Sequence, residues 1–134
     1  MTSEKWFLGL DVGEKRIGVA IGDSAVKIAS PIAVIKNDDE VIINIEKLLD
    51  KYLIDKIIVG LPRNSKGEET AQSQYVRDFS EKLKPLSIPI IFQDESLTSV
   101  QAIERLSGSK TKKSDIDAEA AVIILTDFLE SQNV

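Results

Sequence analysis

The chain has 134 residues and a formal net charge of −5, from 17 lysines and arginines against 22 aspartates and glutamates, and it contains neither cysteine nor histidine. This length fits one domain over residues 1–134; the missing cysteines exclude disulfides and thiolate zinc sites, and the missing histidines exclude Ser-His triads and imidazole metal ligands. Hydrolytic chemistry in this chain therefore has to use carboxylates, lysines, hydroxyl groups or metal ions bound through oxygen.

Residues 6–22, WFLGLDVGEKRIGVAIG, are predicted to form a β-hairpin. Its first strand, 6–12, is apolar on both faces, which is typical of a strand in the centre of a sheet. Asp11 is the exception in that strand, because a buried carboxylate is costly unless a cation meets it. Two interpretations remain open. Asp11 either holds a metal ion or a phosphate at a rigid position, or caps the turn at residues 13–15 with its side chain.

The rest of the chain alternates between apolar strands and amphipathic helices. A third strand is expected over residues 27–36, at an edge or a bulge of the sheet because it contains Pro31. Asn37, Asp38 and Asp39 offer capping side chains for the helix that follows. The further predicted elements are a helix over 39–52, a strand over 56–61 that Pro62 ends, a helix over 68–83, a strand over 88–93, a short helix up to about 106, a basic mobile loop over 107–114 and a helix from about Asp115.

This order of elements predicts a mixed α/β sheet of five strands flanked by helices. Three strands meander antiparallel, and the two later strands lie parallel to the first because helical crossovers lead to them. The carboxyl ends of parallel strands form the functional edge of such a sheet. Asp11, Glu95 and the polar loop over 62–67 all fall on this edge. Asp94 and Glu95 are neighbours in the sequence, so only one of them can face the site if the strand continues.

Seven basic residues fall near the same edge: Lys15, Arg16, Arg63, Lys66, Lys110, Lys112 and Lys113. With a net charge of −5, the chain is not suited to binding nucleic acid through its overall charge, so any phosphate contact has to be local. These side chains could hold the phosphates of a nucleic-acid strand. The plainer interpretation is that about half of the set only solvates loops. The few aromatic residues mostly occupy apolar positions, so no base-stacking platform is predicted.

Four stretches resemble, in order and spacing, the motifs of the YqgF family of RNase H-like nucleases: LGLDVGEKRIGVA, GLPRNSKG, DESLT and DAEAAVIIL. The resemblance covers residues 6–129 and implies an RNase H-like fold. Members of the family are described as pre-16S rRNA nucleases and, by analogy of fold, as Holliday-junction resolvase-like proteins. The acidic residues of its motifs fall on Asp11, Glu95 and Asp117. The chain departs from the family at Ser96, where the family motif has an arginine, and this puts one substrate-contacting cation in question.

The resemblance implies that Asp11, Glu95 and Asp117 are catalytic residues that bind Mg²⁺ or Mn²⁺. Two such ions about 4 Å apart activate a water molecule and stabilise the leaving oxygen in phosphodiester hydrolysis. Magnesium prefers oxygen ligands, so histidine is not needed. Asp11, on the rigid strand, is the expected bridging ligand. For Asp117 an alternative stays open, in which it is the third residue of a helix capped by Ser114 and interacts only with the helix dipole.

The expected function is cleavage of precursor 16S rRNA in 5′-end maturation, with RNA and the ribosomal particle as partners. One alternative is a Holliday junction resolvase that acts on branched DNA, for which a homodimer is expected instead of a monomer. A second is a non-catalytic RNA-binding or ribosome-assembly protein. The glycine-rich hairpin also resembles the phosphate-binding hairpin of actin-like ATPases, but this chain is too short for their second domain. No apolar stretch reaches membrane-spanning length, so a soluble cytoplasmic protein is expected.

Overall fold

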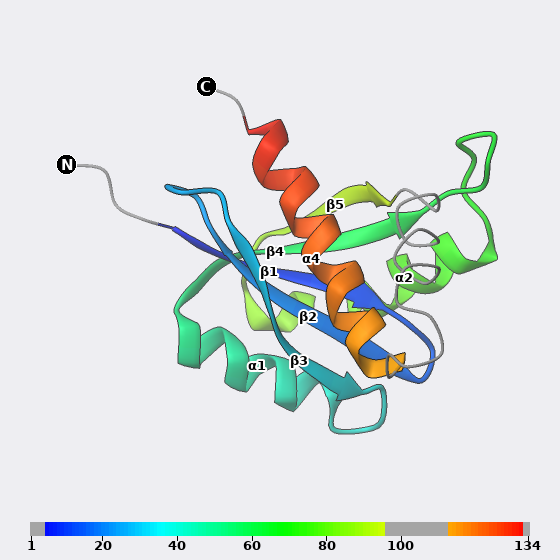
Figure 1. Cartoon of the computed structure of the whole chain (residues 1–134). Coiled ribbons are helices and arrows are strands. Elements are labelled where there is room, and N and C mark those ends of the chain that lie inside the picture. The colour runs from blue at the N-terminus through cyan, green and yellow to red at the C-terminus, as the bar shows by residue number, and fades with distance from the viewer. Residues whose placement is uncertain (1–4, 96–112, 133–134) are drawn as a thin grey trace.

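The computed structural model of the chain describes residues 5–95 and 113–132. Within these residues five strands form one sheet in the order β3-β2-β1-β4-β5 (Figure 1). The strands are β1 (Trp6–Val12), β2 (Arg16–Asp23), β3 (Ala29–Lys36), β4 (Ile54–Pro62) and β5 (Ile90–Glu95). β2 runs antiparallel to β1 and β3, whereas β4 runs parallel to β1, and β5 parallel to β4. The predicted mixed α/β sheet is therefore confirmed.

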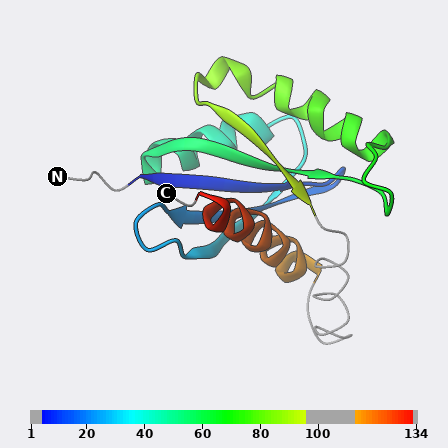
Figure 2. The same ribbon diagram turned by 90° about the horizontal axis from the view of Figure 1, so that it is seen from above.

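Helices cover both faces of the sheet (Figure 2). They are α1 (Val41–Tyr52), α2 (Ala71–Glu81), a short 3-10 helix (Lys84–Leu86) and α4 (Lys113–Ser131). α1 and α2 lie on one face and α4 lies on the other. Each face has its own apolar core, with Leu8 and Ile45 on the α1/α2 side and Phe7 and Ile124 on the α4 side. Among the helices of the described segments, none is long and apolar enough to cross a membrane.

β1 is the central strand, as predicted, and its side chains alternate between the two cores. Leu8, Leu10 and Val12 pack on the α1/α2 side, whereas Phe7 packs under α4. The strand is apolar on both faces because helices cover each of them. Asp11 follows the alternation of Phe7, so its carboxyl group lies on the α4 face near the end of the strand.

β3 occupies an edge of the sheet, and the position predicted for Pro31 is correct. The register of β3 against β2 also shifts between Val19 and Ala20, beside Pro31. The strand starts at Ala29, later than predicted, because Lys27 adopts a left-handed conformation with φ of 59° in the preceding turn. This turn keeps the first residues of the predicted strand out of the sheet.

α1 starts at Val41, later than predicted, with Glu40 as its N-cap residue. Asp38 accepts the backbone N–H of Glu40 through Oδ1 at 3.0 Å, so it stabilises the turn before the helix and does not cap the helix itself. Asn37 instead donates its side-chain amide to the carbonyl oxygen of Gly13 at 2.8 Å. This bond ties the end of β3 to the β1–β2 turn.

The two parallel strands on the other side of β1 also differ from their predicted bounds. β4 begins at Ile54, because Leu53 ends α1 in a left-handed conformation (φ 53°, ψ 56°) and leads directly into the strand. β5 extends from Ile90 to Glu95, because its parallel pairing with β4 continues as far as Pro62 opposite Glu95. The acidic residues at the end of β5 are thus part of the sheet.

α2 begins at Ala71 because the preceding loop has a turn of its own. Asn64 Oδ1 accepts two backbone N–H groups of that loop, at 2.9 and 3.0 Å. α4 begins at Lys113, so the last two residues of the loop predicted over 107–114 are helical, and Ser114 is not the N-cap. The rest of that loop and the predicted short helix before it lie outside the described residues.

Candidate active site at the carboxyl edge of the sheet

The carboxyl ends of β1, β4 and β5 and the N-terminal end of α4 lie at the same side of the molecule (Figure 1). Asp11 is near the end of β1, Glu95 ends β5, and Asp117 lies in the first part of α4. Gly60 lies on the intervening strand β4, and a Cβ added to it would be 3.5 Å from Glu95 Oε2. The missing side chain at Gly60 is required by Ile124 of α4, whose side chain would lie 2.3 Å from such a Cβ, so this glycine lets α4 pack on β4 beside Glu95.

Asp11 and Glu95 form a hydrogen-bonded carboxyl pair. Burial first, and then the neighbouring charge of Glu95, raise the pKa of Asp11 from 3.8 to about 8. Burial also raises the pKa of Glu95, whereas its hydrogen bond with Asp11 lowers it. At neutral pH the pair therefore retains a proton, because the pKa of Asp11 is about 8. At neutral pH both groups ionise together only if a cation compensates their charges. A side chain that merely caps the turn would not need such compensation.

Asp117 is the third acidic group, and it is paired with a basic side chain. Arg16 Nε donates to Asp117 Oδ2 at 2.8 Å, with the two side chains 31% and 22% exposed. α4 reaches this position because β2 has Gly18 beneath it: a Cβ on Gly18 would lie 1.9 Å from the carbonyl oxygen of Asp117. Gly18 is also the cross-strand partner of Asp11. This one glycine therefore brings the start of α4 onto the strand pair that carries Asp11.

We expect Gly18→Ala to displace the start of α4, because the added Cβ would overlap a backbone oxygen that cannot rotate away. The expected loss is about 1–3 kcal/mol in the free energy of unfolding, measured by urea denaturation. Gly22→Ala is the matched control on the same strand, since its Cβ would meet side-chain atoms of Leu125 and Leu129, the nearest at 2.9 Å in each, and no backbone atom among its nearest contacts. Equal losses in the two variants would contradict this account.

The acidic cluster, defined as Asp11, Glu95 and Asp117, has the donor chemistry of a magnesium or manganese site. Its donors are all carboxylate oxygens, which hard cations prefer. Within the described residues, however, no three acidic side chains are arranged to hold one ion as they stand. Asp11 is hydrogen-bonded to Glu95, and Asp117 is paired with Arg16. A cation would replace the shared proton and compete for Asp117.

A polar surface pocket of about 400 Å³ opens beside Asp117. Its lining comes from the β1–β2 turn, the start of α2 and the start of α4: Gly13, Glu14, Lys15, Arg16, Gln72 and Asp117. Lys15 is exposed, and Arg16 reaches the pocket while it contacts Asp117. The two basic residues predicted from the hairpin are thus next to the acidic cluster.

A family model described as "RuvX: Holliday junction resolvase" matches residues 5–131. The chain belongs to the RuvX (YqgF) family. A protein named "Putative pre-16S rRNA nuclease" from Sulfurihydrogenibium sp. (strain YO3AOP1) is 45% identical over 128 residues, which cover 92% of this chain and 88% of that protein. A protein of the same name from Caldanaerobacter subterraneus subsp. tengcongensis is 45% identical over 133 residues, covering 93% of this chain and 96% of that protein.

Two solved structures share the fold of this RuvX protein. Thermus thermophilus RuvC in complex with a Holliday junction substrate superimposes with a TM-score of 0.56 at 13% identity, over 96% of this chain and 95% of that chain. The fowlpox virus resolvase in complex with Holliday junction DNA superimposes with a TM-score of 0.51 at 16% identity, over 94% of this chain and 97% of that chain. The predicted RNase H-like fold and the predicted family are confirmed.

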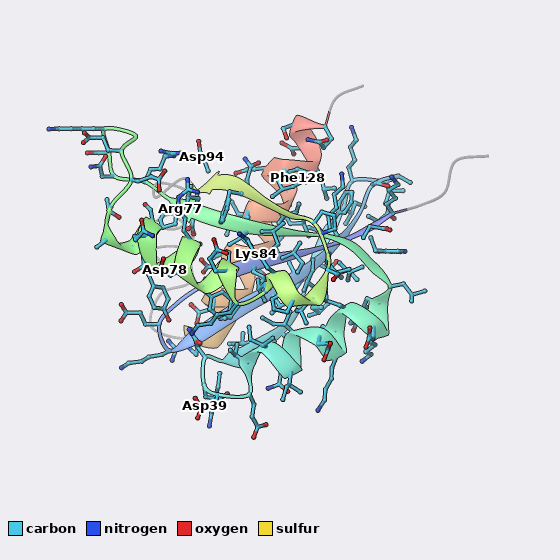
Figure 3. The ribbon with its side chains drawn as sticks, turned by 180° about the vertical axis from the view of Figure 1, so that it is seen from behind. Asp39, Arg77, Asp78, Lys84, Asp94 and Phe128 are labelled. Atoms are coloured by element: carbon cyan, nitrogen blue, oxygen red, sulfur yellow. The ribbon has the colours of Figure 1, made fainter. Side chains whose placement is uncertain are left out.

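Arg63 lies apart from the acidic cluster of the RuvX protein. Its Nε donates to Asp94 Oδ1 at 2.8 Å. Asp94 shares the α2 face of β5 with Phe92, on which Arg77 stacks with its guanidinium 5.0 Å from the ring centre. Figure 3 views the molecule from behind, with Asp94 and Arg77 labelled. Glu95 points to the opposite face, toward Asp11. Asp94 and Glu95, which are neighbours on β5, thus contact different partners on opposite faces of the sheet. Arg63 lies at the same edge of the sheet as the acidic cluster but on the other face.

The other residues predicted for the RuvX site are placed less fully. Lys66 is exposed in the loop after β4. Lys113 is the first residue of α4, and its side chain is outside the described part of the chain. Lys110, Lys112 and Ser96 also lie outside the described residues.

Three residues of the site were not singled out by sequence reasoning. Gly18 and Gly60 allow α4 to approach the sheet closely beside the acidic cluster. A glycine inside a strand pattern does signal a close approach, so this indication was present in the sequence. Gln72 lines the pocket from α2. No local pattern marks Gln72, because its role depends on how α2 is placed against the hairpin.

Proposed function

We propose that this RuvX protein is a metal-dependent nuclease that cleaves precursor 16S rRNA in the cytoplasm. The observation that carries the proposal is the half-buried Asp11–Glu95 carboxyl pair with the charge of Asp117 beside it. Such a cluster opposes folding on its own, because desolvated like charges repel. A cation removes that penalty. The substrate class is taken from the names of relatives that are 45% identical to the chain.

The roles of the residues follow from their positions. Bound Mg²⁺ or Mn²⁺ would supply an activated water molecule and would stabilise the leaving oxygen of a phosphodiester. Asp11, on the central strand, is the ligand held most rigidly, and Glu95 and Asp117 approach it from the two sides. Lys15 and Arg16 line the adjacent pocket, where they are placed to hold the phosphates of the strand to be cut.

The described residues place few basic groups at the site, and this supports a short single-stranded RNA segment as substrate more than a four-way junction. Among the described residues, Lys15 and Arg16 are the basic ones that line the pocket beside the acidic cluster. A junction resolvase has to hold several duplex arms, and each phosphate contact needs a lysine or an arginine. With a net charge of −5, the protein has no overall electrostatic attraction to nucleic acid that could replace the phosphate contacts it lacks. The ribosomal particle would supply the remaining affinity for RNA.

Junction resolution is the second candidate, and the description of the matching family model favours it. Two symmetric cuts in a junction need two active sites, so this function requires a homodimer. Trimming an RNA end requires only a monomer.

The deciding experiment compares cleavage of a pre-16S 5′ leader RNA with cleavage of a synthetic four-way DNA junction at matched magnesium and salt concentrations. We expect the RNA to be cut, the junction to remain intact, and both to survive in EDTA. Symmetric nicking of the junction with the RNA left intact would reassign the protein as a resolvase. Binding of the RNA without cleavage of either substrate would indicate a non-catalytic RNA-binding protein.

A further inference from the structure

The Arg16–Asp117 ion pair joins a candidate phosphate-binding group to a candidate metal ligand. Arg16 Nε donates to Asp117 Oδ2 at 2.8 Å. Asp117 cannot offer this oxygen to a cation while the contact lasts, and Arg16 cannot offer its Nε–H to a phosphate. Within the described segments, Asp117 is the one member of the acidic cluster that forms a salt bridge. A metal ion that binds Asp117 and a phosphate that binds Arg16 would therefore each have to break this ion pair.

Both backbones are fixed, so the pair can change only by rotation of its side chains. The carbonyl oxygen of Asp117 lies against Gly18, with no room for even a Cβ between the helix and the strand. Arg16 pairs with Lys36 of β3, and its carbonyl oxygen accepts the N–H of Gly13 at 2.9 Å. The two side chains are partly exposed, so their rotation needs no rearrangement of the core.

The pocket beside the pair gives the guanidinium of Arg16 a second position. Its charged lining consists of Lys15, Arg16, Glu14 and Asp117, so the charges cancel while the ion pair is intact. When a cation takes Asp117, the pocket becomes positive and suits an anion. An arginine and a lysine side by side are well matched to the non-bridging oxygens of a phosphodiester.

We propose that the Arg16–Asp117 pair is a switch that couples metal binding to phosphate binding, an inference that rests on the nuclease function proposed above. A metal ion that takes Asp117 releases Arg16 into the pocket, and a phosphate that takes Arg16 releases Asp117 to the metal. Each ligand raises the affinity for the other by the same factor, because linkage between binding sites is reciprocal. Arg16 is thus a positioning residue for Asp117 as well as a phosphate contact.

The first test follows arginine Nε–H signals by NMR during a titration with Mg²⁺. Arg16, Arg63 and Arg77 each donate Nε–H to a carboxylate in the metal-free protein. We expect the Arg16 signal to shift and to exchange faster with solvent, because it loses its partner, whereas the other two remain in place as internal controls. Magnesium binding without a change at Arg16 overturns the switch. Absence of magnesium binding overturns the proposed function as well.

The second test measures Mn²⁺ affinity by isothermal titration. Arg16→Gln should bind Mn²⁺ about fivefold more tightly than the wild type, or better, because Asp117 is no longer held. Lys36→Gln is the matched control: it removes the same charge from the exposed cross-strand partner of Arg16. Its affinity should change by less than about twofold, as for an exposed charge. Equal gains in both variants would show a general charge effect and overturn the switch. Circular dichroism verifies that both variants fold.

Discussion

Asp11→Asn is expected to abolish metal binding at the acidic cluster and to reduce RNA cleavage at least about a hundredfold. Asp11 is hydrogen-bonded to Glu95 and also experiences the charge of Asp117, so it is the member of the cluster that both of the others approach. Loss of a residue that only supports a metal ligand already lowers affinity or activity about 10–100-fold. Loss of the central ligand should lower it at least as much.

Isothermal titration of the metal-free protein with Mn²⁺ measures the binding, and cleavage of the leader RNA measures the activity. Glu119→Gln is the matched control, because it removes one carboxylate from an exposed position of the helix that carries Asp117. The control should bind Mn²⁺ as the wild type does. Undiminished Mn²⁺ binding by Asp11→Asn would place the ion elsewhere and would reject the site.

The metal-free protein is expected to lose stability as the pH rises, because the pKa of Asp11 is raised from 3.8 in an unperturbed carboxyl group to about 8 in the folded chain. Between these values the folded state keeps a proton that the unfolded chain has released, so each increase in pH favours unfolding. The stabilisation is complete below the lower value and is lost as the pH passes the higher one. One proton gives a slope of at most about 1.4 kcal/mol per pH unit. The raised pKa of Glu95 acts in the same direction.

Urea denaturation in EDTA across this pH range tests the expectation. Asp11→Asn should remove most of the slope, and at a pH above about 8 it should be more stable than the wild type, because asparagine cannot ionise. Added Mn²⁺ should restore stability to the wild type at high pH, where it replaces the lost proton. A variant that is clearly less stable than the wild type at every pH would instead make Asp11 a structural hydrogen-bonding residue.

The sequence by itself indicated the succession and direction of the strands and the family, and it singled out Asp11, Glu95 and Asp117 as candidate site residues. Apolar faces repeat every two residues in a strand and about every 3.6 in a helix, and this local pattern depends only on burial. It was enough to place Asp11 on a central strand and Glu95 at the end of a parallel one. Element ends were less well predicted, since Leu53 and Lys27 adopt left-handed conformations that their residue types do not announce.

Only the tertiary structure decided how these residues use their charges. Asp11 shares a proton with Glu95, and Arg16 is bonded to Asp117, 101 positions away along the chain. Arg63, predicted for the same site, is bonded to Asp94 on the other face of the sheet. Each outcome depends on distances between segments that are remote in sequence and on the burial that their packing creates. Ionisation and ion pairing respond to those distances steeply, whereas the periodicity of a strand or a helix does not.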